Sequence, residues 1–173
     1  STELLRTSVN HGMDILGGKA ISRGPKNLLA HAYFGLPVGI TVEGANILTR
    51  ALIIFGQGAI RCHPYALKQV DAVENGDLKG FDKAFWNHVG HVFKNKMRTI
   101  VLGLTRGRLA KSYGKGPLKK YNRKLAWVSA TFAFYADMAM MTLGGDLKRK
   151  EAITARFGDI LSWMYIASAV SKR

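Results

Sequence analysis

Apolar residues recur at steps of three and four along most of this 173-residue chain. The pattern is clearest in residues 47–59, 125–139 and 153–164, where it gathers apolar side chains on one face of an α-helix. Signals for β-strands are nearly absent, because no hairpin dipeptide separates two alternating apolar runs. We therefore predict an all-α fold, a helical bundle of about six helices with no sheet.

Glycine and proline mark the expected helix ends. The pairs Gly17-Gly18 and Gly144-Gly145 are typical of helix C-termini, because glycine adopts a left-handed backbone without steric cost. Asp146 is then expected to cap the next helix. The other expected breaks are Gly24-Pro25, Leu36-Pro37, Pro64, Asn75-Gly76 and the stretch from Gly114 to Pro117.

The composition excludes several classes of protein. A hydrophobic share of 47% and an aromatic share of 10% are too high for a disordered chain. A single cysteine excludes a disulfide scaffold and a cysteine-based zinc or iron–sulfur site. No signal peptide is visible at the start. The first residue is Ser1 and helical periodicity begins at once, so we expect a piece of a longer protein.

Positive charge is concentrated in the middle of the chain. The formal net charge is +15, residues 94–124 hold eleven Lys or Arg, and no carboxylate lies between Lys83 and Tyr135. This block is either a solvated basic face or the contact surface for an anionic partner. One candidate function is therefore a basic helical module that binds anionic membrane or nucleic acid through residues 94–124. The nearby Tyr113 and Tyr121 are too few for base stacking, so no nucleic acid is expected.

Residues 125–143 form the longest weakly charged run, and Asp137 is its only charged residue. The length just reaches that of a membrane span, but an uncompensated Asp in hydrocarbon costs about 2.5–3.5 kcal/mol. We predict a buried helix of the bundle and leave peripheral membrane contact as the alternative.

Glu43 is the only acidic residue between Ile15 and Gln69, and it immediately precedes an apolar helical segment. An exposed Glu43 would complement the positive end of the helix dipole, which is worth about 0.3–1 kcal/mol. A Glu43 that points into an apolar cavity would instead lose hydration and become a usable general base. Thr41 or Glu43 could also cap the helix.

The segment Thr41-Val-Glu-Gly-Ala-Asn-Ile-Leu-Thr-Arg50 resembles the stretch of acyl-CoA dehydrogenases that carries their catalytic glutamate. Upstream, Asp14-Ile-Leu-Gly-Gly18 resembles the family's Gln-x-x-Gly-Gly turn, whose backbone meets the FAD of the neighbouring subunit. The resemblance implies that Glu43 is the base and that the backbones of Gly17, Gly18 and Gly44 contact FAD. Asp14, Val42, Ala45 and Ile47 depart from the family's usual residues, so no side-chain contact to FAD is expected from residues 14, 45 and 47.

The chain is most similar to one branch, the large FadE-type bacterial enzymes of fatty-acid β-oxidation. The similarity continues through Phe55-Gly-Gln-Gly-Ala-Ile-Arg-Cys-His-Pro64 and through residues 144–149 and 155–161. It implies that residues 1–64 are the last part of the dehydrogenase C-terminal helical domain and that residues 65–173 are a helical C-terminal extension.

The same resemblance implies an activity. The intact enzyme would desaturate a fatty acyl-CoA between Cα and Cβ to a trans-2-enoyl-CoA, with FAD as cofactor. Electron-transfer flavoprotein or a similar acceptor, a homo-oligomer and a cytoplasmic location, free or at the inner membrane surface, are implied as well. The 173 residues alone are expected to bind no FAD tightly and to show no turnover.

Other candidate sites in the sequence are weak. His88 and His91 share a helix face at a spacing that metals can use, but no third ligand has a natural spacing. Cys62 and His63 are adjacent, and adjacent helical side chains do not face each other. We therefore predict neither a metal site nor a catalytic thiol.

Overall fold

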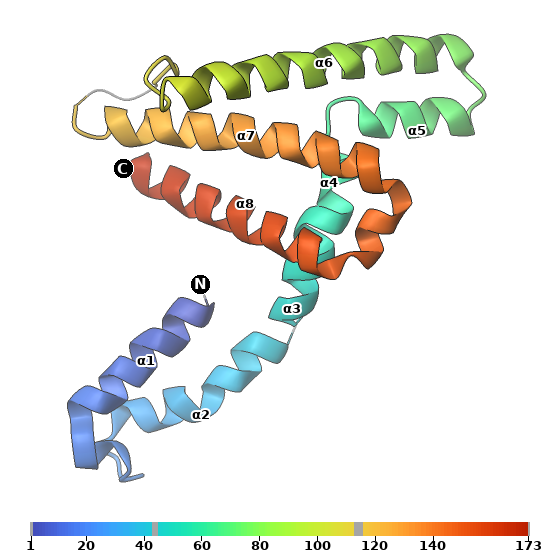
Figure 1. Cartoon of the computed structure of the whole chain (residues 1–173). Coiled ribbons are helices and arrows are strands. Elements are labelled where there is room, and N and C mark those ends of the chain that lie inside the picture. The colour runs from blue at the N-terminus through green and yellow to red at the C-terminus, as the bar shows by residue number, and fades with distance from the viewer. Residues whose placement is uncertain (1, 43–44, 113–115, 173) are drawn as a thin grey trace. The chain divides into compact units, whose positions relative to one another are not determined.

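A computed structural model describes residues 2–42, 45–112 and 116–172, and these residues form helices and turns without a strand (Figure 1). The predicted all-α fold is confirmed. The chain divides into two compact units, Ser1–Thr49 and Arg50–Arg173, and each is described by itself.

The first unit is a helical hairpin with a short third helix. Its elements are α1 (Thr2–Leu16), a 3₁₀ turn (Gly17–Ala20), α2 (Leu28–Thr41) and α3 (Asn46–Leu48). Gly12 of α1 faces Leu29, and a Cβ at this glycine would come within 2.6 Å of the leucine side chain. The Asn46 side chain donates a hydrogen bond to Thr2 Oγ1 at 2.6 Å, which joins the start of α3 to the start of α1.

The break expected at Leu36-Pro37 is wrong, because α2 continues through Pro37 to Thr41. Proline removes one backbone donor from the helix, but the rest of the ladder can continue around it. Thr41 Oγ1 donates to the Pro37 carbonyl at 2.8 Å, so Thr41 closes α2 and does not cap the next helix.

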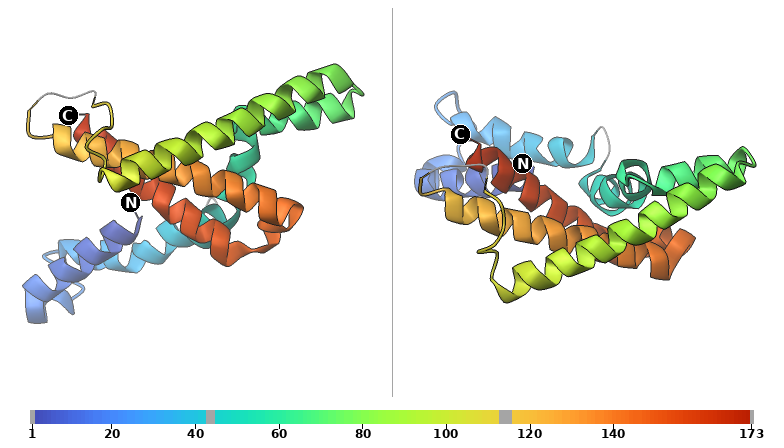
Figure 2. Two further views of the ribbon diagram at one scale, coloured as in Figure 1. Left: turned by 45° about the horizontal axis from the view of Figure 1, so that its top comes forward. Right: turned by 90° about the horizontal axis from the view of Figure 1, so that it is seen from above.

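The second unit contains the longer helices. Its elements are a π-helical stretch (Thr49–Gln57), α4 (Gly58–Cys62), α5 (Ala66–Glu74), α6 (Leu78–Leu104), α7 (Lys119–Leu143), a 3₁₀ turn (Gly144–Arg149) and α8 (Glu151–Ser171). Helix α7 packs against α6 on one side and against α8 on the other (Figures 1 and 2). The described residues thus form seven helical segments of nine or more residues where about six were predicted. The nine-residue α5 is too short for its periodicity to be evident.

Aromatic rings form the main core of this unit. The Phe55 ring of the π-helical stretch stacks on Phe157 of α8 at 4.2 Å between centroids and meets Phe132 of α7 edge-on at 6.0 Å. A second cluster around Leu102, Ala110 and Trp127 joins the end of α6 to α7. Phe55, Phe132 and Phe157 lie on the apolar faces that the three- and four-residue steps predict, whereas Leu102 and Ala110 lie outside the periodic segments.

Both glycine pairs end helices as predicted. Gly17 follows α1 with φ of 55°, and Gly144 follows α7 with φ of 49°. The predicted cap at Asp146 is wrong: the residue lies in the 3₁₀ turn and pairs with Arg149 at 3.8 Å, while Lys150 precedes α8 without a side-chain cap. The chain turns once more before α8 begins, so Asp146 stands too early to cap it.

Helix α7 is a helix of the bundle, as predicted. Its Asp137 side chain is buried together with Ala130, Ala136 and Ala139. No single described helix has the length and hydropathy of a membrane span, and the segments Leu28–Thr41 and Asn46–Cys62 reach them only as a bent pair.

Candidate functional site

The candidate base, Glu43, and the neighbouring Gly44 lie outside the described residues. Helix α2 ends before them at Thr41, and α3 begins after them at Asn46. The segment thus has a helix on either side, and the role of Glu43 stays a prediction.

The turn at Gly17 and Gly18 is an open backbone surface. Both glycines are exposed, and a Cβ at either position would meet nothing within 4 Å. Gly17 has a left-handed backbone that strains other residues. A flat ligand or a second chain can therefore approach this backbone closely.

Asn27 fixes this turn, and sequence reasoning did not single it out. Its Nδ2 lies 2.8–3.0 Å from the carbonyl oxygens of Lys19, Ala20 and Ser22. Its Oδ1 accepts two backbone N–H groups of the first turn of α2, each at 3.1 Å. The side chain is buried and acts both as the cap of α2 and as a clamp on the chain after Gly17-Gly18. An Asn directly before an apolar helix was the available signal.

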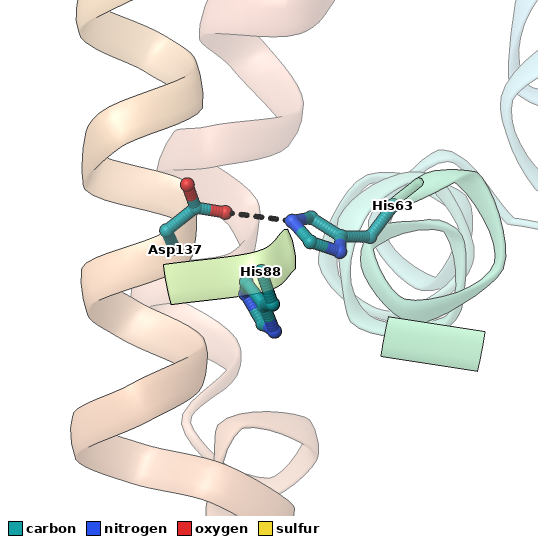
Figure 3. A group of neighbouring side chains, drawn as sticks. All are labelled: His63, His88 and Asp137. Atoms are coloured by element: carbon teal, nitrogen blue, oxygen red, sulfur yellow. Dashed lines mark ion pairs between the residues drawn. The ribbon is translucent and has the colours of Figure 1, made fainter. Parts of the chain in front are cut away.

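The second unit contains a buried polar cluster made by His63, His88 and Asp137 (Figure 3). His63 follows α4, His88 lies on α6 and Asp137 on α7, so the cluster joins three elements. His63 Nε2 lies 3.1 Å from Asp137 Oδ1, and these side chains are only 7% and 2% exposed. One ligand-type atom from each of the three residues lies within 4.8 Å of the other two. Sequence spacing offered no third ligand for the pair His88 and His91, and the structure brings His63 and Asp137, both distant in sequence, to His88.

Hydrogen bonds assign the protons on the two imidazole rings. His63 Nδ1 accepts the backbone N–H groups of Tyr65 at 3.2 Å and Ala66 at 2.9 Å, so the neutral ring carries its proton on Nε2, toward Asp137. His88 Nδ1 lies 3.2 Å from Gln69 Oε1, and the tautomer with its proton on Nδ1 can donate to this oxygen, which leaves the lone pair on Nε2. Burial lowers the pKa of His88, nearby His63 lowers it further, and Asp137 opposes both.

These proton positions favour a metal-free cluster of polar side chains over a metal centre. A metal-bound histidine ligates through one nitrogen and donates from the other. His63 would have to ligate through Nε2, but its Nδ1 accepts two N–H groups from the start of α5 and has no proton to donate. Within the described residues, His63 Nε2, His88 Nε2 and Asp137 Oδ2 have no hydrogen-bond partner. His63 Nε2 nevertheless lies 3.1 Å from Asp137 Oδ1, a close contact without hydrogen-bond alignment.

An apolar cavity of about 250 Å³ lies beside this cluster. Phe55, Phe132 and Met140 line its apolar wall, and His63 and Asp137 lie at its polar side. Cys62 also lines it, but no base is paired with the thiol among the described contacts. The cavity is lined by residues of α4, α6 and α7, the same helices that the polar cluster connects.

These features define an all-α chain with a polar cluster and an apolar cavity in its second unit. The family model for the bacterial-type acyl-CoA dehydrogenase C-terminal domain matches residues 60–173. The chain therefore belongs to the acyl-CoA dehydrogenase family, through its bacterial-type C-terminal domain. The match contains all three residues of the His63–His88–Asp137 cluster and begins after the Glu43 segment. No solved structure matches the chain.

Proposed function

We propose that this chain is part of an FAD-dependent acyl-CoA dehydrogenase that converts a fatty acyl-CoA to a trans-2-enoyl-CoA in fatty-acid β-oxidation. The observation that carries this proposal is the family match over residues 60–173. The segment Val42-Glu-Gly-Ala-Asn-Ile-Leu-Thr-Arg50, which resembles the family's catalytic stretch, lies just upstream in the same chain.

In this proposal Glu43 is the base. Its carboxylate takes the proton from Cα of the thioester while the Cα–Cβ double bond forms. FAD, when bound, accepts the β-hydrogen as hydride. The α-proton of a thioester is a weak acid, so negative charge on the carbonyl oxygen needs a donor; the backbone N–H of Glu43 serves as one, as in an oxyanion hole. The acyl chain excludes water, which strengthens the carboxylate as a base.

The turn at Gly17 and Gly18 fits a backbone contact to the flavin. It is exposed, left-handed at Gly17 and free of neighbours where side chains would project. In the family the equivalent turn meets the FAD of a neighbouring subunit, so we propose a homo-oligomer. We further propose that the polypeptide carrying this chain also contains the domains that hold most of the flavin and the CoA.

The partners and location follow from the same proposal. Electrons leave toward electron-transfer flavoprotein or a similar acceptor, and the enzyme works in the cytoplasm, free or at the inner membrane surface. The 173 residues alone are proposed to retain no flavin and to show no turnover. Stoichiometric flavin in the purified 173-residue chain would contradict this part.

The test is anaerobic mixing of the flavin-loaded parent protein with a long-chain acyl-CoA, with the visible flavin band as readout. The parent is expected to bleach, and its Glu43→Gln variant, which keeps the shape and removes the base, is expected to keep its colour. Bleaching in both would move the base elsewhere, and a parent without flavin would refute the function. Glu74→Gln, a matched carboxylate-to-amide change at an exposed position of α5, serves as the control and should bleach like the parent.

A further inference from the structure

Six cationic side chains surround one cavity of about 650 Å³ at the end of the α6–α7 pair. We name this cavity the basic pocket; its cations are Arg106, Arg108, Lys119, Lys120, Arg123 and Lys124. No Asp or Glu lines it. In the part of the chain that the structure describes, none of the six is in an ion pair. The concentration of positive charge is therefore not neutralised by the described protein.

Two of these cations lie in the turn after α6, whose backbone packs against α7. Arg106 and Gly107 both have left-handed backbones, with φ of 49° and 74°. The Gly107 N–H donates to the Leu102 carbonyl at 2.7 Å, which closes the end of α6. A Cβ at Gly107 would lie 3.1 Å from the Arg123 carbonyl oxygen, so this turn packs directly on α7. The backbone that carries the exposed Arg106 and Arg108 is thereby held beside Arg123.

The start of α7 adds further positive charge. Leu118 stands at the cap position without a side-chain cap, and the first turn holds Lys119 and Lys120 with no acidic residue. These lysines lie at the positive end of the helix dipole, which favours anions. Lys119 and Arg123, and likewise Lys120 and Lys124, are four residues apart, so like charges face each other. An anion at this helix start relieves both kinds of repulsion.

Arg123 of α7 lines the basic pocket. Its Nε is buried without a hydrogen-bond partner among the described residues, so the terminal Nη groups are the donors expected to meet a ligand. A guanidinium group presents parallel N–H donors that match two oxygens of one phosphate group. Lysines add point charges around such a group without fixing its orientation. The donor set therefore fits a phosphate better than a single-oxygen acceptor.

We propose that the basic pocket binds a phosphate group, carried by a phospholipid headgroup or by a soluble diphosphate. Arg123 orients two phosphate oxygens, Arg106 and Arg108 close over them from the turn, and the lysines of the first turn of α7 balance the charge. The site is independent of the Glu43 chemistry, so the failure of either proposal leaves the other standing.

The test measures pyrophosphate binding to the full chain by titration calorimetry, and sedimentation with phosphatidylcholine vesicles with and without phosphatidylglycerol. Arg123→Gln is expected to weaken binding about tenfold or more, the size of one charge-assisted hydrogen bond. Lys79→Gln is the control: it removes an exposed cation at the opposite end of α6 and should change binding less than about twofold. Circular dichroism checks that both variants keep their helices.

Each outcome decides between the sources or refutes the pocket. Pyrophosphate binding without vesicle recruitment identifies a soluble phosphate ligand, and recruitment only by vesicles with phosphatidylglycerol identifies a lipid headgroup, provided that Arg123→Gln reduces the signal. Binding of neither probe refutes the proposal. So does an equal loss in Arg123→Gln and Lys79→Gln, because the attraction would then be spread over the whole basic surface.

Discussion

Removing the Asp137 carboxylate tests whether the buried cluster stabilises the second unit. Asp137 is 2% exposed and lies 3.1 Å from His63 Nε2, whose side chain is 7% exposed. Removing the carboxylate leaves the buried Nε2–H of the neutral His63 ring without its charged neighbour, which costs about 1.5–3 kcal/mol. The change also removes the buried Oδ2, which has no donor among the described residues, so the net loss lies in the lower half of this range. Asp137→Ala is therefore expected to lower the free energy of unfolding by about 2 kcal/mol.

Asp159→Ala is the matched control for this substitution. Asp159 also pairs with a basic side chain, Arg50, but its side chain is 43% exposed. The Arg50 hydrogen bond lowers the pKa of Asp159, yet solvent screens the pair. The expected loss is below about 1 kcal/mol. The comparison thus separates the effect of burial from the mere presence of a basic partner.

Urea unfolding followed by tryptophan fluorescence is the assay. The chain has three tryptophans, Trp86, Trp127 and Trp163, and all lie in the second unit, so the signal reports that unit. His63→Ala also removes the ring that accepts the backbone N–H groups of Tyr65 and Ala66 at the start of α5. A double-mutant cycle of His63→Ala and Asp137→Ala cancels this separate loss. The remaining coupling energy between the two side chains is expected to be about 1–2 kcal/mol. Equal losses in Asp137→Ala and Asp159→Ala, or a coupling near zero, would refute the reasoning.

Two further predictions concern the pH dependence caused by His88 and the replacement of Gly107 and Gly90 by alanine. The folded-state pKa of His88 lies below its ordinary value of 6.5, so the unfolded chain binds the proton more readily. The free energy of unfolding of the second unit should therefore be highest above pH 6.5. It should fall as the pH drops from 6.5 through the lowered pKa. His88→Gln should flatten this slope in unfolding curves between neutral and acidic pH, and an unchanged slope would contradict the assignment. Gly107→Ala should cost about 1–2 kcal/mol in thermal unfolding, because its φ is 74° and its Cβ would crowd Arg123. Gly90→Ala in the interior of α6, where nothing lies within 4 Å, should instead stabilise by about 0.5–1 kcal/mol, and equal effects of the two substitutions would refute the packing argument.

Local rules predicted most of the fold. The helix ends at Gly17 and Gly144 follow from the backbone preference of glycine, which needs no knowledge of distant residues. The rule that proline ends a helix failed at Pro37, because α2 continues past the one backbone hydrogen bond that proline removes. The rule that Asp caps the next helix failed at Asp146, because a 3₁₀ turn lies between this residue and the start of α8. Propensity is a weak guide wherever such context intervenes.

The buried cluster could be anticipated only in part. Asp137 stood out in the sequence as a lone charge in an apolar helix, and buried charges are normally paired. That reasoning predicts a partner but not which one, because His63 and His88 lie far from Asp137 along the chain. Their meeting depends on how α4, α6 and α7 pack, and periodicity does not encode that packing.

The π-helical stretch Thr49–Gln57 has a consequence for insertions and deletions. Each π-type hydrogen bond encloses one more residue than an α-type bond. One extra residue in a plain α-helix would rotate every later side chain by about 100°, since 3.6 residues make a turn. The wider stretch absorbs such a residue, so Arg50 still reaches Asp159 while Phe55 stacks on Phe157. A related chain one residue shorter here can keep both contacts by forming a plain α-helix, and length differences between relatives are expected to fall in this stretch.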